Sequence, residues 1–136
     1  MRLMDRVRDA MVVDPPQLHG DASAQEAGEA LQRPEVRAVF VSDDGRFLGV
    51  VTRKTLVREV VAAGRDPRST PLREIAEAAQ NTIGSGLPLD EAFRFLEEHD
   101  LDRVAVLEEG RLVGVLSRAV LQRRLAEDEP PLEDEL

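Results

Sequence analysis

The chain of 136 residues contains no cysteine, no tryptophan and no tyrosine. Without a thiol it can form no disulfide, no thiolate nucleophile and no cysteine-ligated zinc or iron–sulfur site. Its aromatic residues are four phenylalanines, so we expect no platform on which nucleic-acid bases could stack.

Positive charge is also scarce. Eighteen lysines and arginines stand against 27 acidic residues, which gives a net charge of −9, and Lys54 is the single lysine. A protein that binds duplex nucleic acid neutralises phosphates with a basic face. We therefore expect no nucleic-acid partner.

Long hydrophobic runs are missing as well. No apolar segment approaches the roughly 18–20 residues that a bilayer requires, so we expect no membrane span. The first six residues carry charges where a signal peptide needs an apolar stretch, which predicts a cytoplasmic protein. With 42% hydrophobic residues, the chain is expected to fold as one domain or as two small units that share a core.

The sequence does contain an internal repeat. Shifted by 65 residues, the chain aligns with itself without a gap, and identical residues recur at Glu26 and Glu91, Leu31 and Leu96, Val39 and Val104, Gly49 and Gly114, and Leu56 and Leu121. Chance matches would scatter over many registers, so the pattern indicates a duplication. We place the first repeat at 1–66, the second at 67–126, and an acidic, solvated tail at 127–136.

Both repeats predict the same order of elements. In the first, Ser23 and Glu26 fit a capping box that begins a helix over 24–32. A hairpin with strands at 38–41 and 47–51 follows, and Thr52 caps a helix that ends at Gly64. The second repeat is expected to contain a short helix over 71–79, a strand at 82–83, a helix over 89–99, strands at 103–107 and 112–116, and a last helix from Ser117 to about Leu125.

Two such repeats resemble a tandem pair of CBS domains, the regulatory module named after cystathionine β-synthase. The family motif follows the second hairpin strand: glycine, two apolar residues, Thr or Ser, two variable residues, and Asp. The two copies here are Gly49-Val-Val-Thr52-Arg-Lys-Thr55 and Gly114-Val-Leu-Ser117-Arg-Ala-Val120. The resemblance covers about residues 5–125.

The resemblance implies an α/β fold of two tandem CBS repeats, each β-α-β-β-α with a short leading helix, that form one pseudo-twofold pair. It implies two clefts between the repeats, which in the family often bind AMP, ADP, ATP or S-adenosylmethionine as regulatory ligands. It further implies a homodimer and a sensor rather than an enzyme, with no cofactor required.

Thr52 and Ser117 have a structural and a functional interpretation. Each lies where a strand turns into a helix, so each can act as an N-cap. A helix start also favours a phosphate, and Arg53, Lys54 and Arg118 follow directly with positive charge. In the family, this Thr or Ser position contacts phosphate.

In the family, the aspartate at the last motif position hydrogen-bonds the ribose hydroxyls, and both copies here lack it. Thr55 replaces it in the first copy and keeps one hydroxyl, whereas Val120 in the second copy offers no polar group. We therefore expect a ribosyl ligand at the Thr52–Thr55 cleft before the other. Arg103 and Thr82 leave the second cleft able to bind a simple anion.

No catalytic or metal site is expected. His19 and His99 lie in turn contexts without metal-ligand spacing and are interpreted as solvated loop residues, and no serine has a nucleophile context. Two functions remain open: a ligand-sensing module, or a dimeric structural and interaction module that has lost nucleotide binding. Excess apolar side chains on the helix Leu56–Val61, and Phe95 outside the inward face of its helix, favour a homodimer.

Overall fold

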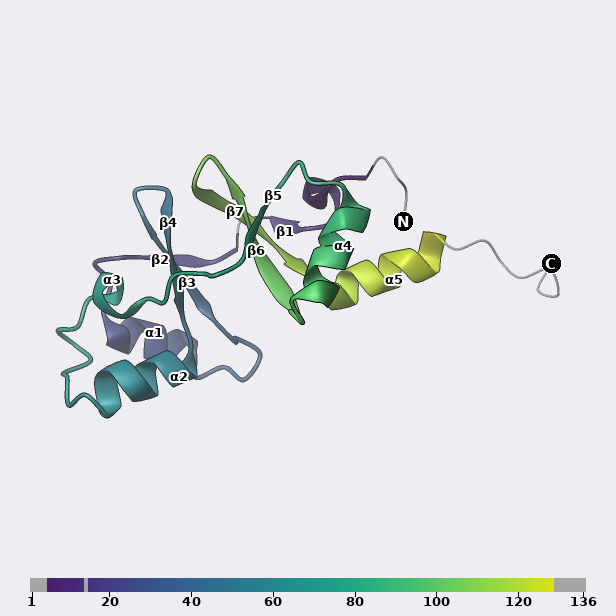
Figure 1. The fold of residues 1–136 in the computed structure, drawn as a ribbon. Coiled ribbons are helices and arrows are strands. Elements are labelled where there is room, and N and C mark those ends of the chain that lie inside the picture. The colour runs from purple at the N-terminus through teal and green to yellow at the C-terminus, as the bar shows by residue number, and fades with distance from the viewer. Residues whose placement is uncertain (1–4, 14, 129–136) are drawn as a thin grey trace. The chain divides into compact units, whose positions relative to one another are not determined.

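The computed structural model describes residues 5–13 and 15–128 (Figure 1). The chain forms two compact units. Unit 1 combines the described part of Met1–Asp14 with Asn81–Glu108 and the chain from Val113 onward, and unit 2 consists of Pro15–Gln80 and Glu109–Leu112. The repeat boundaries at residues 66 and 126 stay a prediction. Most of the predicted tail at 127–136 lies outside the described residues.

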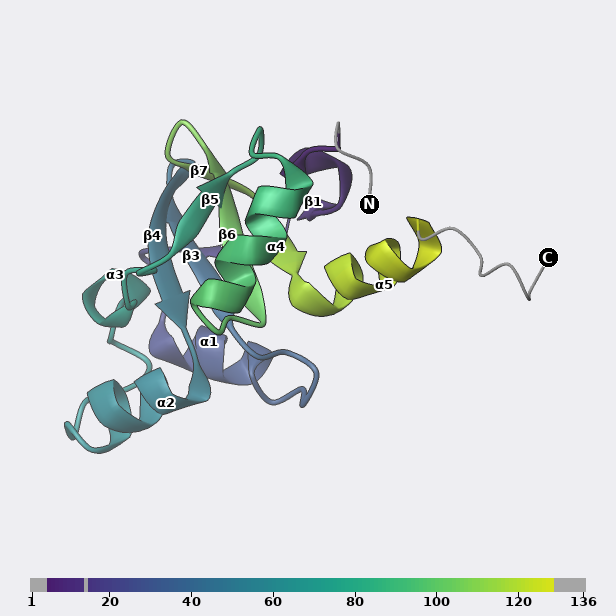
Figure 2. The ribbon, with the colours of Figure 1, turned by 45° about the vertical axis from the view of Figure 1, so that its right-hand side comes forward.

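Unit 2 is a three-stranded sheet with helices packed on one side (Figures 1 and 2). Its elements are β2 (Gln17–His19), α1 (Ala24–Ala30), β3 (Val39–Asp43), β4 (Arg46–Val51), α2 (Arg53–Leu56), the π-helix η2 (Val57–Val61) and α3 (Leu72–Ile75). β2 runs parallel to β3, and β3 and β4 form the predicted hairpin. The core joins Ala27 of α1 and Leu31, which caps that helix, to Val41 and Val51 of the sheet and Leu72 of α3.

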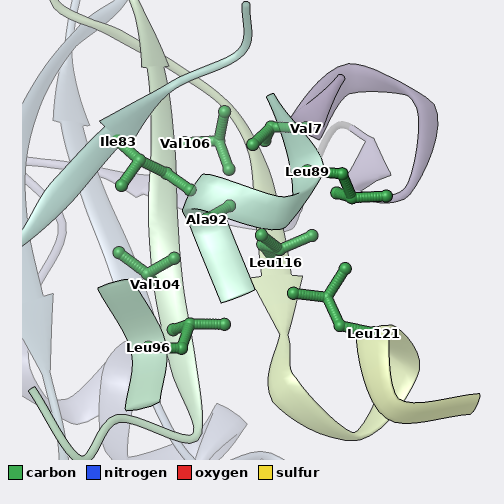
Figure 3. Close-up of a cluster of buried hydrophobic side chains, with 9 residues drawn as sticks. All are labelled: Val7, Ile83, Leu89, Ala92, Leu96, Val104, Val106, Leu116 and Leu121. Atoms are coloured by element: carbon green, nitrogen blue, oxygen red, sulfur yellow. The ribbon is translucent and has the colours of Figure 1, made fainter. Parts of the chain in front are cut away.

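Unit 1 repeats this arrangement with a four-stranded sheet in the order β1-β7-β6-β5. Its elements are the 3-10 helix η1 (Val7–Asp9), β1 (Val12–Val13), β5 (Thr82–Gly84), α4 (Leu89–Glu98), β6 (Arg103–Glu108), β7 (Arg111–Ser117) and α5 (Arg118–Asp128). Figure 3 shows the side chains of its core, where Ala92 and Leu96 of α4 meet Val104 and Val106 of β6. α5 continues past the predicted end near Leu125.

The predicted helix starts are confirmed. The Ser23 hydroxyl accepts a hydrogen bond from the Glu26 N–H at 3.2 Å, and the Glu26 carboxylate accepts from the Ser23 N–H at 3.0 Å. Thr52 and Thr55 form the same reciprocal cap at the start of α2. These caps are local in sequence, so the sequence is sufficient to predict them.

The short helix predicted over 71–79 is wrong beyond its first turn. α3 ends at Ile75 because Ala76 adopts an extended conformation with φ −60° and ψ 131°. The next residue, Glu77, then pairs with Val50 as an antiparallel bridge beside β4. A backbone partner distant in sequence thus overrides the local tendency to continue the helix.

The 65-residue register is confirmed in the structure. β2 and β5 correspond residue for residue, and the two hairpins follow at the same offset. Buried positions recur with it: Ala27 and Ala92 are both fully buried, as are Val41 and Val106. The duplication read from the sequence is therefore a duplication of core positions.

Each repeat begins with a leading segment, which is η1 with β1 in the first repeat and α3 with Glu77 in the second. Each leading segment belongs to the unit that contains the hairpin of the other repeat. Val12 pairs with Val115 in unit 1, and Glu77 pairs with Val50 in unit 2, at equivalent positions of the register. The entry to each helix repeats the same bond: Val7 N–H donates to Leu87 O at 2.9 Å, and Leu72 N–H donates to Ala22 O at 2.8 Å. The two leading segments are exchanged between the repeats.

This exchange explains the glycine that opens each motif. A Cβ atom on Gly49 would lie 2.2 Å from the carbonyl oxygen of Glu77, and one on Gly114 would lie 2.9 Å from that of Val12. Both distances are shorter than van der Waals contact, and both neighbours are backbone atoms of residues that pair with the hairpin. Only a residue without a side chain lets the leading segment approach so closely.

We expect Gly49→Ala and Gly114→Ala each to lower the free energy of unfolding by about 1–3 kcal/mol, because the added methyl group must displace a paired backbone segment. Gly84→Ala is the matched control, since a Cβ there would meet no atom within 4 Å. Urea denaturation of the three variants measures the difference. Equal midpoints for all three would contradict the close approach.

Candidate functional site

The first motif joins the end of β4 to the start of α2. Thr55 is fully buried, and its hydroxyl oxygen accepts from the Thr52 N–H at 3.0 Å. The two threonine hydroxyls are 3.1 Å apart, and the Thr55 N–H donates to the Thr52 hydroxyl at 3.3 Å. The two threonines therefore hold one another across the first helical turn.

Thr55 also contacts a residue that the sequence analysis missed. Its hydroxyl donates to Oε1 of Glu77 at 3.2 Å, and the Arg58 guanidinium donates to the same oxygen. The helix predicted over 71–79 includes Glu77, so the prediction missed its pairing with β4. The sequence does hold one indication of this pairing: at the 65-residue offset Glu77 corresponds to Val12, which pairs with β7 in the structure.

The two basic residues of the first motif differ in their role. Arg53 donates to the carbonyl oxygens of Leu31 and Arg33, at 2.5 and 2.8 Å, and so caps the end of α1. Lys54 is exposed. The positive charge left for an anion at this motif therefore comes from Lys54.

The second motif lacks an equivalent polar network. Ser117 ends β7, and its hydroxyl accepts from the Val120 N–H at 3.4 Å. The Arg118 backbone donates to Asp102 O at 2.9 Å, and its guanidinium lies 3.7 Å from the Asp100 carboxylate. The predicted helix cap is present, whereas Val120, at the motif position where the family has aspartate, is an apolar, half-buried side chain.

Thr82 and Arg103 are brought near one another on the sheet of unit 1. Thr82 pairs with Ala105 in a parallel register, and side chains alternate along a strand, so Arg103 shares a face with Thr82. Both are exposed. They provide one hydroxyl and one cation, which together suit an anion.

His19 is solvent-exposed as predicted, but it lies in a strand and not in a loop. It ends β2, and its Nε2 lies 3.0 Å from Oδ1 of Asp43. Arg73 binds the same carboxylate through two nitrogens, at 2.5 and 3.3 Å, and also bonds Asp21. The Arg73 guanidinium, with a smaller contribution from His19, holds the pKa of Asp43 below its ordinary value.

His99 lies exposed in the turn after α4, as predicted, but Phe95 differs from expectation. The two rings stack with centroids 4.2 Å apart, and Phe95 is half-buried against the core of unit 1. His99 thus covers the ring that the sequence analysis left for a partner chain. Within residues 5–13 and 15–128, no three His, Cys, Asp or Glu side chains are grouped so that they could hold a metal ion.

A model of the CBS domain matches residues 7–62 and again residues 80–127. The chain belongs to the CBS domain family. Its mixed α/β structure is the tandem CBS pair that the motif spacing predicted. None of the helices in the described part of the CBS pair is long and apolar enough to span a bilayer.

Relatives of this CBS pair include Hypoxic response protein 1 of Mycobacterium tuberculosis, 30% identical over 102 residues that cover 74% of this chain and 71% of that protein. A crystal structure of Hypoxic Response Protein I with two coordinated zinc ions matches with a TM-score of 0.75 and 26% identity, over 89% of this chain and 99% of that one. CBSX2 in complex with AMP matches in fold, with a TM-score of 0.71, 21% identity and coverage of 90% and 96%.

The ion pair between Arg73 and Asp43 predicts a stability that depends on pH. Because the pKa of Asp43 is lower in the folded chain, its stabilising contribution is complete above the ordinary carboxyl pKa of about 4 and is lost as the pH falls below it. We expect Asp43→Asn to flatten the acid limb of a plot of urea midpoint against pH.

The control for this experiment is Asp44→Asn, because the Asp44 side chain is 97% exposed and lies outside the Arg73 pair. That variant should keep the acid limb of the unaltered chain. An Asp43→Asn protein as acid-sensitive as the parent would show that the pair does not carry the dependence.

Proposed function

We propose that this CBS pair is a regulatory module, without catalytic activity, that binds an adenosyl nucleotide at its first motif. The observation that carries the proposal is the difference between the two motifs. The first combines Lys54 and Thr52 with the carboxylate of Glu77 within hydrogen-bonding distance of Thr55, whereas the second places Val120 at the equivalent position.

The chemistry of the first motif suits the two polar ends of such a ligand. The first N–H groups of a helix have no intrahelical acceptor. At the start of α2 the Thr55 N–H already donates to the Thr52 hydroxyl, so the N–H groups of Arg53 and Lys54 are the ones that can bind a phosphate, together with the Lys54 side chain. The carboxylate of Glu77 accepts hydrogen bonds from hydroxyl groups. CBSX2, which shares the fold, binds AMP, and this supports the choice of nucleotide.

Zinc is not part of this proposal. Hypoxic Response Protein I holds two zinc ions. In unit 2, Asp21 and Asp43 bind Arg73, and His19 lies against Asp43. A guanidinium already neutralises those carboxylates, which disfavours a second cation among them. The simple anion expected at Thr82, Arg103, Ser117 and Arg118 remains a second, weaker site in the proposal.

A second candidate function, that of a dimeric interaction module, is favoured by a separate observation. Val57 and Val61 of η2 are 57% and 74% exposed, and they lie one turn apart on the same side of the helix. Two adjacent exposed valines are the kind of apolar surface that another chain covers. We propose that a second copy of this chain covers them, which makes the protein a homodimer.

Nucleotide binding is tested with AMP, ADP, ATP and S-adenosylmethionine in a thermal-shift assay followed by calorimetry. A ligand at 100 times its Kd adds about 2.7 kcal/mol to the free energy of unfolding. We expect Lys54→Ala to weaken AMP binding about tenfold, as the loss of one charge-assisted hydrogen bond would. Ser117→Ala, at the second motif, is the control and should leave the first site unchanged.

If none of the four ligands shifts the unfolding midpoint at millimolar concentration, the sensing function is wrong and the interaction module is the remaining function.

The dimer is tested by light scattering at tens of micromolar. We expect twice the chain mass of 15.1 kDa for the unaltered protein and the monomer mass for a Val57→Glu, Val61→Glu double variant, because a buried carboxylate pair opposes association. Val13→Glu is the control, since Val13 is 60% exposed on β1 in unit 1. A parent chain that scatters as a monomer would contradict the dimer.

A further inference from the structure

We propose that Glu77 recognises the vicinal diol of the ligand, with Thr55 as the residue that positions it. This inference rests on the proposed nucleotide function and assigns its ribose-binding group. It places the carboxylate that the motif itself lacks on a different segment of the chain, the leading segment of the second repeat.

The backbone of Glu77 is held in place first. Its N–H donates to the carbonyl oxygen of Val50 at 2.9 Å, and its own carbonyl oxygen accepts from the Val50 N–H at the same distance. Gly49 allows this close pairing because any side chain there would meet the Glu77 carbonyl. The residue therefore has a defined position beside the end of β4.

The side chain is held through one oxygen. Thr55 and Arg58 both donate to Oε1. Among the residues that the structure describes, none is hydrogen-bonded to Oε2. A carboxylate has about four acceptor sites on its two oxygens, so two donors leave capacity for two more. The Glu77 side chain is 45% exposed, so solvent and ligands can reach it.

This arrangement is chemically suited to two adjacent hydroxyl groups. Each hydroxyl can donate one hydrogen bond to an ionised carboxylate, and such bonds are stronger than those between neutral groups. A carboxylate that is already oriented loses little side-chain freedom on binding.

Thr55 cannot itself be the group that contacts the diol. It is fully buried, and its single hydroxyl proton is directed at Glu77. Its effect on a ligand must pass through the orientation of the Glu77 carboxylate, which makes it a positioning residue.

The second repeat provides an internal comparison. At the 65-residue offset, Glu77 corresponds to Val12 and Thr55 corresponds to Val120. Both members of the polar pair are thus valines in the second copy, where Val12 pairs with Val115 of β7 just as Glu77 pairs with Val50. The two positions differ together between the copies, as expected for residues that act as one unit.

The test compares AMP with 2′,3′-dideoxy-AMP by titration calorimetry. For the unaltered chain we expect AMP to bind at least tenfold more tightly than the dideoxy compound. Glu77→Gln should remove this preference while it leaves the affinity for the dideoxy compound within about twofold, since only the diol contact is lost. Thr55→Val should reduce the preference in the same direction. Glu74→Gln, which alters a nearby carboxylate bonded to Arg65, is the control and should keep it.

The outcomes separate this inference from the function on which it rests. If both compounds bind the unaltered chain equally well, a nucleotide site exists but Glu77 does not recognise its diol. A preference for AMP that survives Glu77→Gln overturns the assignment in the same way, and it would mean that Glu77 only pairs with Arg58. If neither compound binds, the proposed function is wrong and the assignment is wrong with it.

Discussion

The close approach of each leading segment to the hairpin of the other repeat is the constraint on which this structure depends. It requires a glycine at one position of each hairpin, since Gly49 faces the Glu77 carbonyl and Gly114 faces the Val12 carbonyl. It also supplies each core with a buried leucine or valine from a distant part of the sequence, Leu72 in one unit and Val7 in the other. Neither unit has a complete core without the segment that it receives.

The same constraint connects the fold to the proposed site. The leading segment that completes unit 2 brings Glu77 to the first turn of α2, where Thr55 and Arg58 bind its carboxylate. In unit 1 the corresponding segment brings Val12, whose side chain is apolar. One backbone arrangement, used twice, thus yields one polar motif and one apolar motif.

The sequence was sufficient for features that depend on near neighbours or on the repeat. The capping boxes at Ser23 and Thr52 involve residues three positions apart, and the two hairpins follow from strand and turn residues. Comparison of the repeats then predicted that equivalent positions are buried in both, although each unit has its own core and the two do not share one. These features predict the fold class of the CBS pair correctly.

The remaining features depend on contacts that no local pattern records. Glu77 meets Thr55 across 22 residues of sequence and Val50 across 27, and this pairing ended the helix predicted over 71–79. His19 joins Arg73 and Asp43 in the same way, by the packing of three elements. Arg53 was expected at the ligand and instead caps α1, because the end of that helix lies within its reach.

The most direct test of the account is an NMR titration of the amide resonances of the full chain with AMP. The account predicts that the amides of Lys54, Thr55 and Glu77 shift together and saturate at one concentration, while those of Val12 and Val120 stay unchanged. Shifts confined to Val12 and Val120, or none at saturating AMP, would contradict it.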